Sequence, residues 1–137
     1  MSDDMRDMLQ KMDTPFGKLL DIQYVEVTPD LIRAELTIRE ELATSATRMH
    51  GGVMMGFADN LGAVATFINL PEGAAGTTTL ESKTNFLAAV PVGQKAIAET
   101  TPLHKGRTTQ VWQTVIFNEA GKKAAIITQT QLILMPQ

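Results

Sequence analysis

One long apolar segment near the middle of the chain dominates the hydrophobic pattern. From Gly51 to Leu70 nearly every position is apolar or small, which predicts a single helix of about 30 Å. Such a helix lacks a polar face, so it is either buried on most sides or spans a bilayer. Its polar residues, Asp59 and Asn60 among them, and the strand-like segments on both sides favour a core helix over a membrane span.

Alternation of apolar and polar positions predicts strands on both sides of this helix. Before it, strands are expected over residues 20–24 and 32–38, with a turn at 28–30. After it come four segments rich in threonine and β-branched residues, at residues 77–88, 94–103, 108–117 and 123–135. Their connections are too short for a crossover helix, so the four strands are expected to be antiparallel neighbours.

The N-terminal segment has a different period. Its apolar residues fall at helical spacing and predict a short amphipathic helix from Ser2 to Asp13, which Pro15 and Gly17 end. The pattern as a whole predicts an α+β fold with a curved antiparallel sheet of about six strands around one long helix. We expect one domain over residues 1–137, with the N-terminal helix in residues 1–14 and the core in 15–137.

Composition narrows the possible functions. A net charge of −3 argues against nucleic acid as a partner, and the absence of cysteine excludes disulfides and thiolate chemistry. Two histidines are too few for a multi-histidine metal site, so no metal is expected. The acidic start lacks the basic and apolar regions of a signal peptide, which predicts a soluble cytoplasmic protein, and no membrane partner is expected.

Asp59 is the strongest candidate for chemistry. A lone carboxylate in an apolar helix is costly unless it is paired, protonated or facing a polar cavity. It could act as a general base on water or attack a substrate itself, and the sequence leaves both routes open. The structural alternative is a carboxylate paired with Arg48 or Lys83, or one accepting hydrogen bonds from threonines.

The neighbouring Asn60 points about 100° away from Asp59 on the helix. This direction suits packing or a subunit contact, and Asn60 is also a candidate for substrate binding.

Several motifs together resemble those of the hotdog-fold acyl-CoA thioesterases, in particular the phenylacetate-pathway type. The resemblance covers residues 15–135 and rests on the following segments: His50-Gly51-Gly52, Asp59-Asn60, Thr79 to Leu87, Pro91-Val92-Gly93 and Lys105-Gly106-Arg107. It implies hydrolysis of acyl-CoA to a free acid and coenzyme A, without a cofactor. It also implies active sites at dimer interfaces, often within homotetramers that are dimers of dimers.

The resemblance also implies roles for single residues. Gly52 resembles the residue whose backbone N–H polarises the thioester carbonyl, and Asp59 resembles the catalytic acid. Thr79 resembles a hydroxyl residue that orients the acid or the water. Thr44 stands where the family often has asparagine, six residues before His50, and is a candidate for substrate binding.

The residues at the helix start support an anion-binding role independently. A helix N-terminus offers unpaired N–H groups and partial positive charge, and Gly51 and Gly52 let a ligand oxygen approach closely. The alternative is that the two glycines only permit a tight turn into the helix. His50 could hold the loop as a structural residue or contact the thioester end of a ligand, and we assign it to binding and not to proton transfer. Lys105 and Arg107, at a predicted hairpin tip, could pair with the phosphates of coenzyme A, or they form a solvated turn.

Helix geometry predicts a site shared between subunits. Asp59 follows Gly52 by seven residues, which separates them by about 10 Å along the helix. One thioester carbonyl must lie close to both groups, so two copies of the chain are expected to contribute one group each.

Two alternative functions stay open: an acyl-CoA-binding protein without turnover, and a hydroxyacyl dehydratase. The dehydratase would need a catalytic histidine before a Phe-Pro-type motif, whereas Gly51 follows His50.

Overall fold

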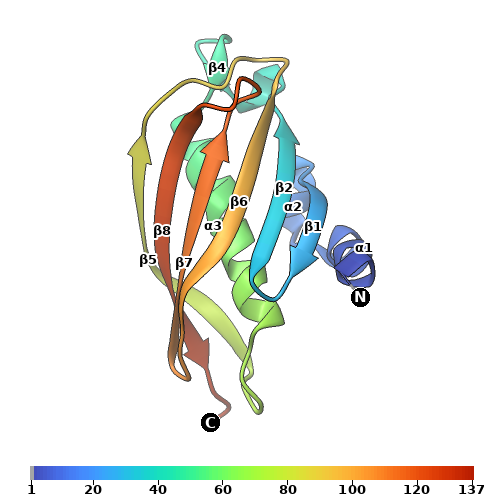
Figure 1. Ribbon diagram of the computed structural model, residues 1–137, viewed down its shortest axis with the longest axis vertical. Helices are drawn as coiled ribbons and strands as arrows, with labels where there is room; N and C mark the ends of the chain where they lie inside the picture. The colour runs from blue at the N-terminus through green and yellow to red at the C-terminus, as the bar shows by residue number, and fades with distance from the viewer. Residues whose placement is uncertain (1) are drawn as a thin grey trace.

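The computed structural model describes residues 2–137 and confirms the predicted α+β architecture. One long helix lies against a curved sheet, and two short helices precede the first strand (Figure 1). The elements, in chain order, are α1 (Ser2–Met12), α2 (Pro15–Leu20), β1 (Gln23–Thr28), β2 (Leu31–Thr37), the 3₁₀ helix η1 (Glu40–Leu42), β3 (Ala43–Thr44), β4 (Arg48–Met49), α3 (Gly51–Ile68), β5 (Gly76–Phe86), β6 (Lys95–Lys105), β7 (Thr109–Phe117) and β8 (Lys123–Leu134).

The main sheet has six antiparallel strands in the order β1-β2-β6-β7-β8-β5. The expectation that the last four strands are antiparallel neighbours is confirmed, since β6, β7, β8 and β5 lie side by side. They do not follow chain order throughout, because β5 pairs with β8 at the edge of the sheet and residues 87–94 carry the chain across to β6. Short connections favour sequential pairing but do not enforce it, because a loop can also cross the end of a sheet.

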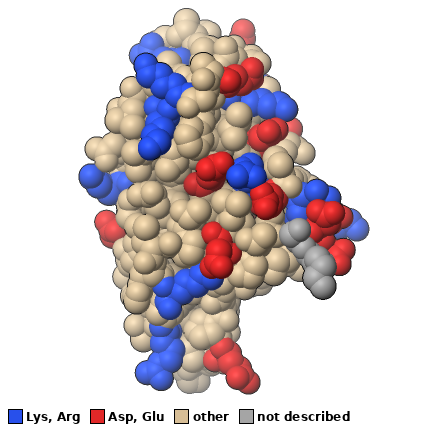
Figure 2. All heavy atoms as spheres, in the orientation of Figure 1, with Lys and Arg blue, Asp and Glu red and all other residues tan. Residues whose placement is uncertain are grey.

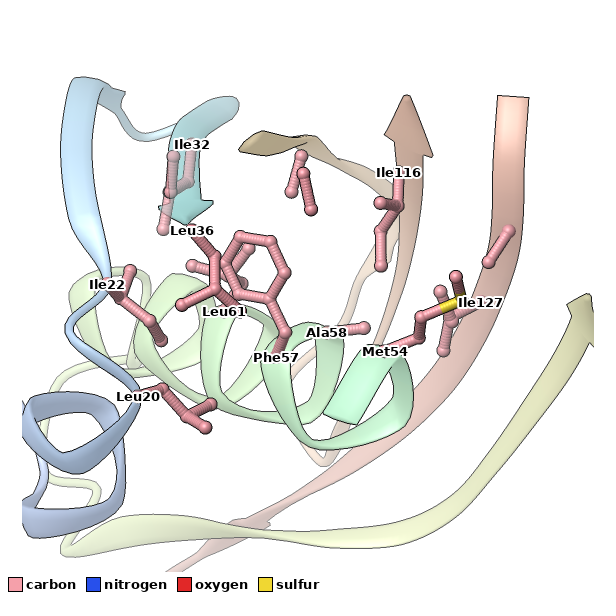
Figure 3. Close-up of a cluster of buried hydrophobic side chains, with 14 of the residues drawn as sticks. Leu20, Ile22, Ile32, Leu36, Met54, Phe57, Ala58, Leu61, Ile116 and Ile127 are labelled. Atoms are coloured by element: carbon pink, nitrogen blue, oxygen red, sulfur yellow. The ribbon is translucent and has the colours of Figure 1, made fainter. Parts of the chain in front are cut away.

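Helix α3 is the centre of the hydrophobic core. Its side chains Phe57 and Leu61 are fully buried and face Ile32 and Leu36 of β2, while Ile116 of β7 lies nearby (Figure 3). Burying side chains of this size stabilises the fold by about 1.5–3 kcal/mol each. By length and composition α3 could cross a membrane, yet half of it is buried in the fold and five strands contact it. It is therefore the core helix that the pattern predicted.

The outer face of the sheet carries charges of both signs. Arg33 on β2 pairs with Glu26 on β1 at 2.6 Å and with Glu99 on β6 at 3.1 Å. On the face shown in Figure 2, acidic and basic side chains are interspersed and do not form a patch of one sign. This face has no electrostatic feature typical of a polyanion-binding surface.

The N-terminal region contains a second helix that the sequence analysis missed. Pro15 and Gly17 were expected to break the chain before a strand over residues 20–24, but residues 15–20 form α2 and β1 begins only at Gln23. Proline is well suited to the first position of a helix, and the Thr14 side chain caps this one by accepting from the Gly17 N–H at 2.9 Å. Asp21, with φ of 64°, ends it.

A buried polar cluster joins this region to α3. The Asp13 carboxylate accepts hydrogen bonds from the Tyr24 hydroxyl at 3.0 Å and from the Asn60 side-chain amide at 3.1 Å. The Thr14 hydroxyl donates to the side-chain oxygen Oδ1 of Asn60 at 2.6 Å. Gly17 is required beside this cluster, because a Cβ there would lie 2.2 Å from Asp13 Oδ2. Burial and the neighbouring Asp13 charge raise the pKa of the Tyr24 phenol well above its usual range.

Replacing Tyr24 by phenylalanine is expected to lower the free energy of unfolding by about 1–3 kcal/mol, because the buried Asp13 carboxylate loses a donor. The wild-type phenol stays neutral when folded but ionises near pH 10.0 when unfolded, so its contribution is present below pH 10.0 and falls as the pH rises above it. Denaturant titrations from pH 7 to 11 measure both effects. Equal pH dependence above pH 10.0 in the two proteins would contradict the assignment.

Candidate active site

The start of α3 is built by a small hairpin. Residues 40–49, expected to be a polar connection, form η1 and the two-residue strands β3 and β4, with Ser45 and Ala46 at positive φ between them. This hairpin brings Thr44 close to the helix start. A pocket of about 320 Å³ opens there, and its lining includes Thr44, Arg48, Gly51, Met54 and Phe86. Two of the predicted binding residues, Thr44 and Gly51, therefore share one pocket.

His50 caps α3. Its Nδ1 atom accepts a hydrogen bond from the Gly52 N–H at 2.8 Å, and its carbonyl oxygen accepts from Val53 at 3.0 Å. The N–H group predicted to polarise a thioester therefore has an intramolecular partner in this structure. Since His50 and Gly52 are both exposed, a ligand oxygen can reach that N–H once the imidazole turns away.

Asp59 lies half-buried on the partly open side of α3. The Thr79 hydroxyl of β5 donates to Asp59 Oδ1 at 2.7 Å. Within residues 2–137 no cation pairs with Asp59, and its Oδ2 atom has no hydrogen-bond partner. The structural alternative of an ion pair with Arg48 or Lys83 is therefore wrong, while the threonine contact is present. The arrangement leaves one carboxylate oxygen available to a ligand or to water.

A bulge in β5 sets this arrangement. Thr79 lies opposite Gln131 of β8 and Glu81 lies opposite Thr130, so Leu80 is the extra residue. The bulge turns the side chains of Glu81 and Lys83 to the outside, where Lys83 donates to Asn85 at 3.1 Å. It therefore keeps the lysine away from Asp59. The inner face of β5 carries hydroxyl side chains, of which two, Ser82 and Thr84, have buried oxygen atoms without a partner.

Three predicted site residues lie elsewhere in the chain. Asn60 is buried in the Asp13 cluster described above, which corresponds to the packing role. Lys105, at the end of β6, donates to Asp30 at 2.6 Å and to Asn69, which caps the C-terminal end of α3. Arg107 lies in the adjoining hairpin loop. This hairpin is at the opposite end of α3 from Gly52 (Figure 1).

One side of α3 is not fully covered by the chain's own sheet. The partly open positions recur every three or four residues, and the neighbouring edge strand β5 exposes further apolar side chains. The positions on this side are Gly52, Met55, Asp59, Ala63 and Phe67. A second pocket of about 340 Å³ lies beside them, between α1, α3 and the start of β5, with Met8, Met12, Val64, Phe67 and Thr77 in its lining. An apolar surface of this kind is typical of an interface or a binding groove.

Comparison of the sequence with models of known protein families identifies the family of this chain. The model of the thioesterase superfamily matches residues 47–125, more than half of the chain. The protein belongs to the thioesterase superfamily. The resemblance to hotdog thioesterases predicted from the motifs around His50 and Asp59 is thereby confirmed. The matched residues include the cap of α3, all of α3 and the Thr79 strand.

Named relatives of this thioesterase-superfamily chain act on thioesters. It is 30% identical over 105 residues to the proofreading thioesterase EntH of Cronobacter turicensis, covering 76% of this chain and 74% of the relative. It is 29% identical over 116 residues to the 1,4-dihydroxy-2-naphthoyl-CoA hydrolase of Escherichia coli, covering 84% of this chain and 83% of the relative.

Solved structures share the hotdog fold. Thioesterase HI1161 of Haemophilus influenzae has a TM-score of 0.82 at 25% identity, covering 98% of this chain and 91% of that chain. A thioesterase-type protein of Streptococcus pneumoniae, solved with coenzyme A, has a TM-score of 0.75 at 20% identity, covering 85% of this chain and 88% of that chain. At that identity the similarity concerns the fold.

Proposed function

We propose that this protein hydrolyses acyl-CoA thioesters to free acids and coenzyme A, with Asp59 as the catalytic carboxylate. The observation that carries the proposal is the state of Asp59: it lies in an apolar core helix, has no cationic partner within residues 2–137, and is held through one oxygen by Thr79. The names of the related hydrolases and the coenzyme A bound to a structural neighbour support the substrate class.

The carboxylate can perform the chemistry in two ways. As a general base, Asp59 takes a proton from water while the water oxygen attacks the thioester carbon, and the C–S bond then breaks to release the coenzyme A thiol. As a nucleophile, Asp59 attacks the same carbon, releases the thiol and forms a mixed anhydride that water hydrolyses. A single turnover in ¹⁸O-labelled water, with enzyme in excess over substrate, detects the nucleophilic route when water cleaves the anhydride at the Asp59 carboxyl carbon. Asp59 then carries the ¹⁸O and the product acid has none, whereas the general-base route places ¹⁸O in the product acid and leaves Asp59 unlabelled.

The start of α3 serves as the oxyanion site in this proposal. The thioester oxygen takes the place of His50 Nδ1 as the acceptor of the Gly52 N–H, and the partial positive charge of the helix N-terminus stabilises the tetrahedral intermediate. His50 caps the free helix and contacts the bound ligand. Thr44 and Gly51 line the adjoining pocket, which suits a part of the substrate close to the thioester.

The proposed site is shared between two copies of the chain. Helix α3 runs without a break through Gly52 and Asp59, so the two groups are about 10 Å apart along its axis and do not meet on one carbonyl carbon. A two-fold arrangement along the open side of α3 and the edge of β5 supplies Gly52 from one copy and Asp59 from the other. Contacts of Lys105 and Arg107 with coenzyme A phosphates also require a second copy in this proposal.

A thiol-release assay tests the proposal. The protein is incubated with a panel of aryl and aliphatic acyl-CoA substrates, and the free thiol is measured with a disulfide reagent. We expect release of coenzyme A together with one equivalent of acid, and the preferred acyl group identifies the substrate. Tight binding of acyl-CoA across the panel without thiol release would contradict hydrolysis and favour the binding protein instead.

A further inference from the structure

A continuous chain of buried side-chain hydrogen bonds leads from the backbone of α3 to Asp59. The Gln129 amide nitrogen donates to the Ala58 carbonyl oxygen at 2.8 Å, and the Gln129 carbonyl oxygen accepts from the Gln131 amide nitrogen. The same nitrogen of Gln131 donates to the Thr79 hydroxyl oxygen at 2.7 Å, and Thr79 donates to Asp59. Both glutamines are at most 1% exposed.

The direction of every bond in this chain is determined by its first member. A backbone carbonyl such as that of Ala58 only accepts, so Gln129 must turn its NH₂ group towards α3 and its oxygen towards Gln131. Gln131 must then present its NH₂ group to the Gln129 oxygen, and the second proton of that group goes to Thr79. The Gln131 oxygen lies 2.9 Å from the Thr77 hydroxyl, which is also 2.9 Å from the Leu132 carbonyl oxygen. The Thr79 oxygen is therefore an acceptor towards Gln131, and its single proton is directed to Asp59.

Gly62 makes the first bond possible. It lies one turn after Ala58 in α3, and a Cβ at this position would lie 2.1 Å from the Gln129 amide nitrogen. Glycine inside a helix is about 1 kcal/mol less favourable than alanine, so its presence here has a packing reason. Only with glycine at residue 62 can the Gln129 side chain lie flat against the helix and reach the carbonyl.

We propose that Gln131, oriented by Gln129, is a positioning residue that fixes the Thr79 hydroxyl as a donor to Asp59. The proposal rests on the catalytic role of Asp59 given above. The hydroxyl holds Oδ1 in one orientation and leaves Oδ2 directed to the open side of α3, where water or the thioester carbon is bound. Without the glutamine, the Thr79 hydroxyl rotates freely and the carboxylate is no longer held in one rotamer.

The test replaces Gln131 by methionine, which has a similar size and no donor. We expect kcat for the preferred acyl-CoA to fall at least tenfold while KM changes less than twofold, since the substrate contacts remain. Gln110→Met is the matched control: Gln110 lies opposite Gln131 on β7 and is equally buried, but it bonds to Trp112 and to the Asn69 carbonyl. This control is expected to keep kcat within twofold at a comparable loss of thermal stability.

A double-mutant cycle separates positioning from general damage to the core. In a Thr79→Val background, Gln131→Met is expected to cause no further fall in kcat, because its effect acts through Thr79. Gly62→Ala displaces Gln129 from the opposite side and should reproduce the fall in kcat, again only when Thr79 is present. This variant adds intrinsic helix stability, so it provides the test if Gln131→Met does not fold.

The possible results test the positioning role of Gln131 and the hydrolase assignment separately. Wild-type kcat in Gln131→Met or Gly62→Ala, or equal falls with and without the Thr79 hydroxyl, overturns the positioning role and leaves the hydrolase assignment intact. Full activity of an Asp59→Asn variant overturns the proposed function itself. Equal losses of kcat in Gln110→Met and Gln131→Met would show a general effect of burying an apolar side chain in this layer, and would also overturn the proposal.

Discussion

Replacing Asp59 by asparagine is expected to lower kcat for acyl-CoA hydrolysis about 1000-fold, within the range for removal of a general base. Asparagine has the same shape and its carbonyl oxygen can still accept from Thr79, so the helix and the pocket are preserved. It can neither take a proton from water nor form an anhydride efficiently. KM is expected to change little, because the groups that hold the substrate remain. Steady-state thiol release at several substrate concentrations measures both constants.

Glu99→Gln is the control for this change. It also replaces an acid by its amide, but on the outer face of the sheet, where Glu99 pairs with Arg33. We expect it to retain wild-type kcat with a stability loss below about 1 kcal/mol. An Asp59→Asn protein that folds normally and keeps more than a tenth of wild-type kcat would show that another group performs the chemistry.

Mixing two inactive variants is expected to restore activity. Asp59→Ala chains retain the Gly52 N–H, and Gly52→Pro chains retain Asp59 but lack that N–H, at a helix start where proline is tolerated. In a random 1:1 mixture half of the dimers are mixed, and each mixed dimer has one complete site and one site with both defects. The expected specific activity is therefore about one quarter of wild type, against almost none for either variant alone.

Two tags on the co-expressed chains allow purification of the mixed dimers. Since one of their two sites is complete, their thiol release is expected to rise to about one half of wild type. The control mixes Asp59→Ala with Asp59→Asn chains, which share one defect and cannot complement each other. Recovery in this control would reveal wild-type contamination. Mixed oligomers of Asp59→Ala and Gly52→Pro that stay inactive would show that each chain carries a complete site, contrary to the axial separation along α3.

The sequence predicted most of the fold because the two hydrophobic periods are clear. The apolar run became α3, and the alternating segments after it became β5 to β8 with small changes at their ends. Its error at residues 15–20 has a local cause: a proline and a glycine suggest a break, yet proline also begins helices, and Thr14 caps this one. Only the tertiary structure, in which Asp13 packs against Gly17, shows that the proline begins a helix here and does not break the chain.

The site was predicted less completely. Asp59 was identified because a carboxylate within an apolar helix is costly, and Thr79 was singled out through the family resemblance. Gln129 and Gln131 were missed because β8 alternates threonine and glutamine there, so the sequence does not reveal which of them faces the core. The threonines point outward and the larger amides are buried, an arrangement that is stable only because every amide has a partner.

By itself, the sequence determined the long helix, the strands of the main sheet and the acid at the centre of the helix, because period and polarity are local properties of the chain. The tertiary structure alone decided that β5 forms the sheet edge, that its bulge directs Lys83 outward, and that Gln131 reaches Thr79. Those features depend on which strands pair and in which register. Pairing is chosen by the free energy of the whole sheet packed on α3, and no segment encodes it separately.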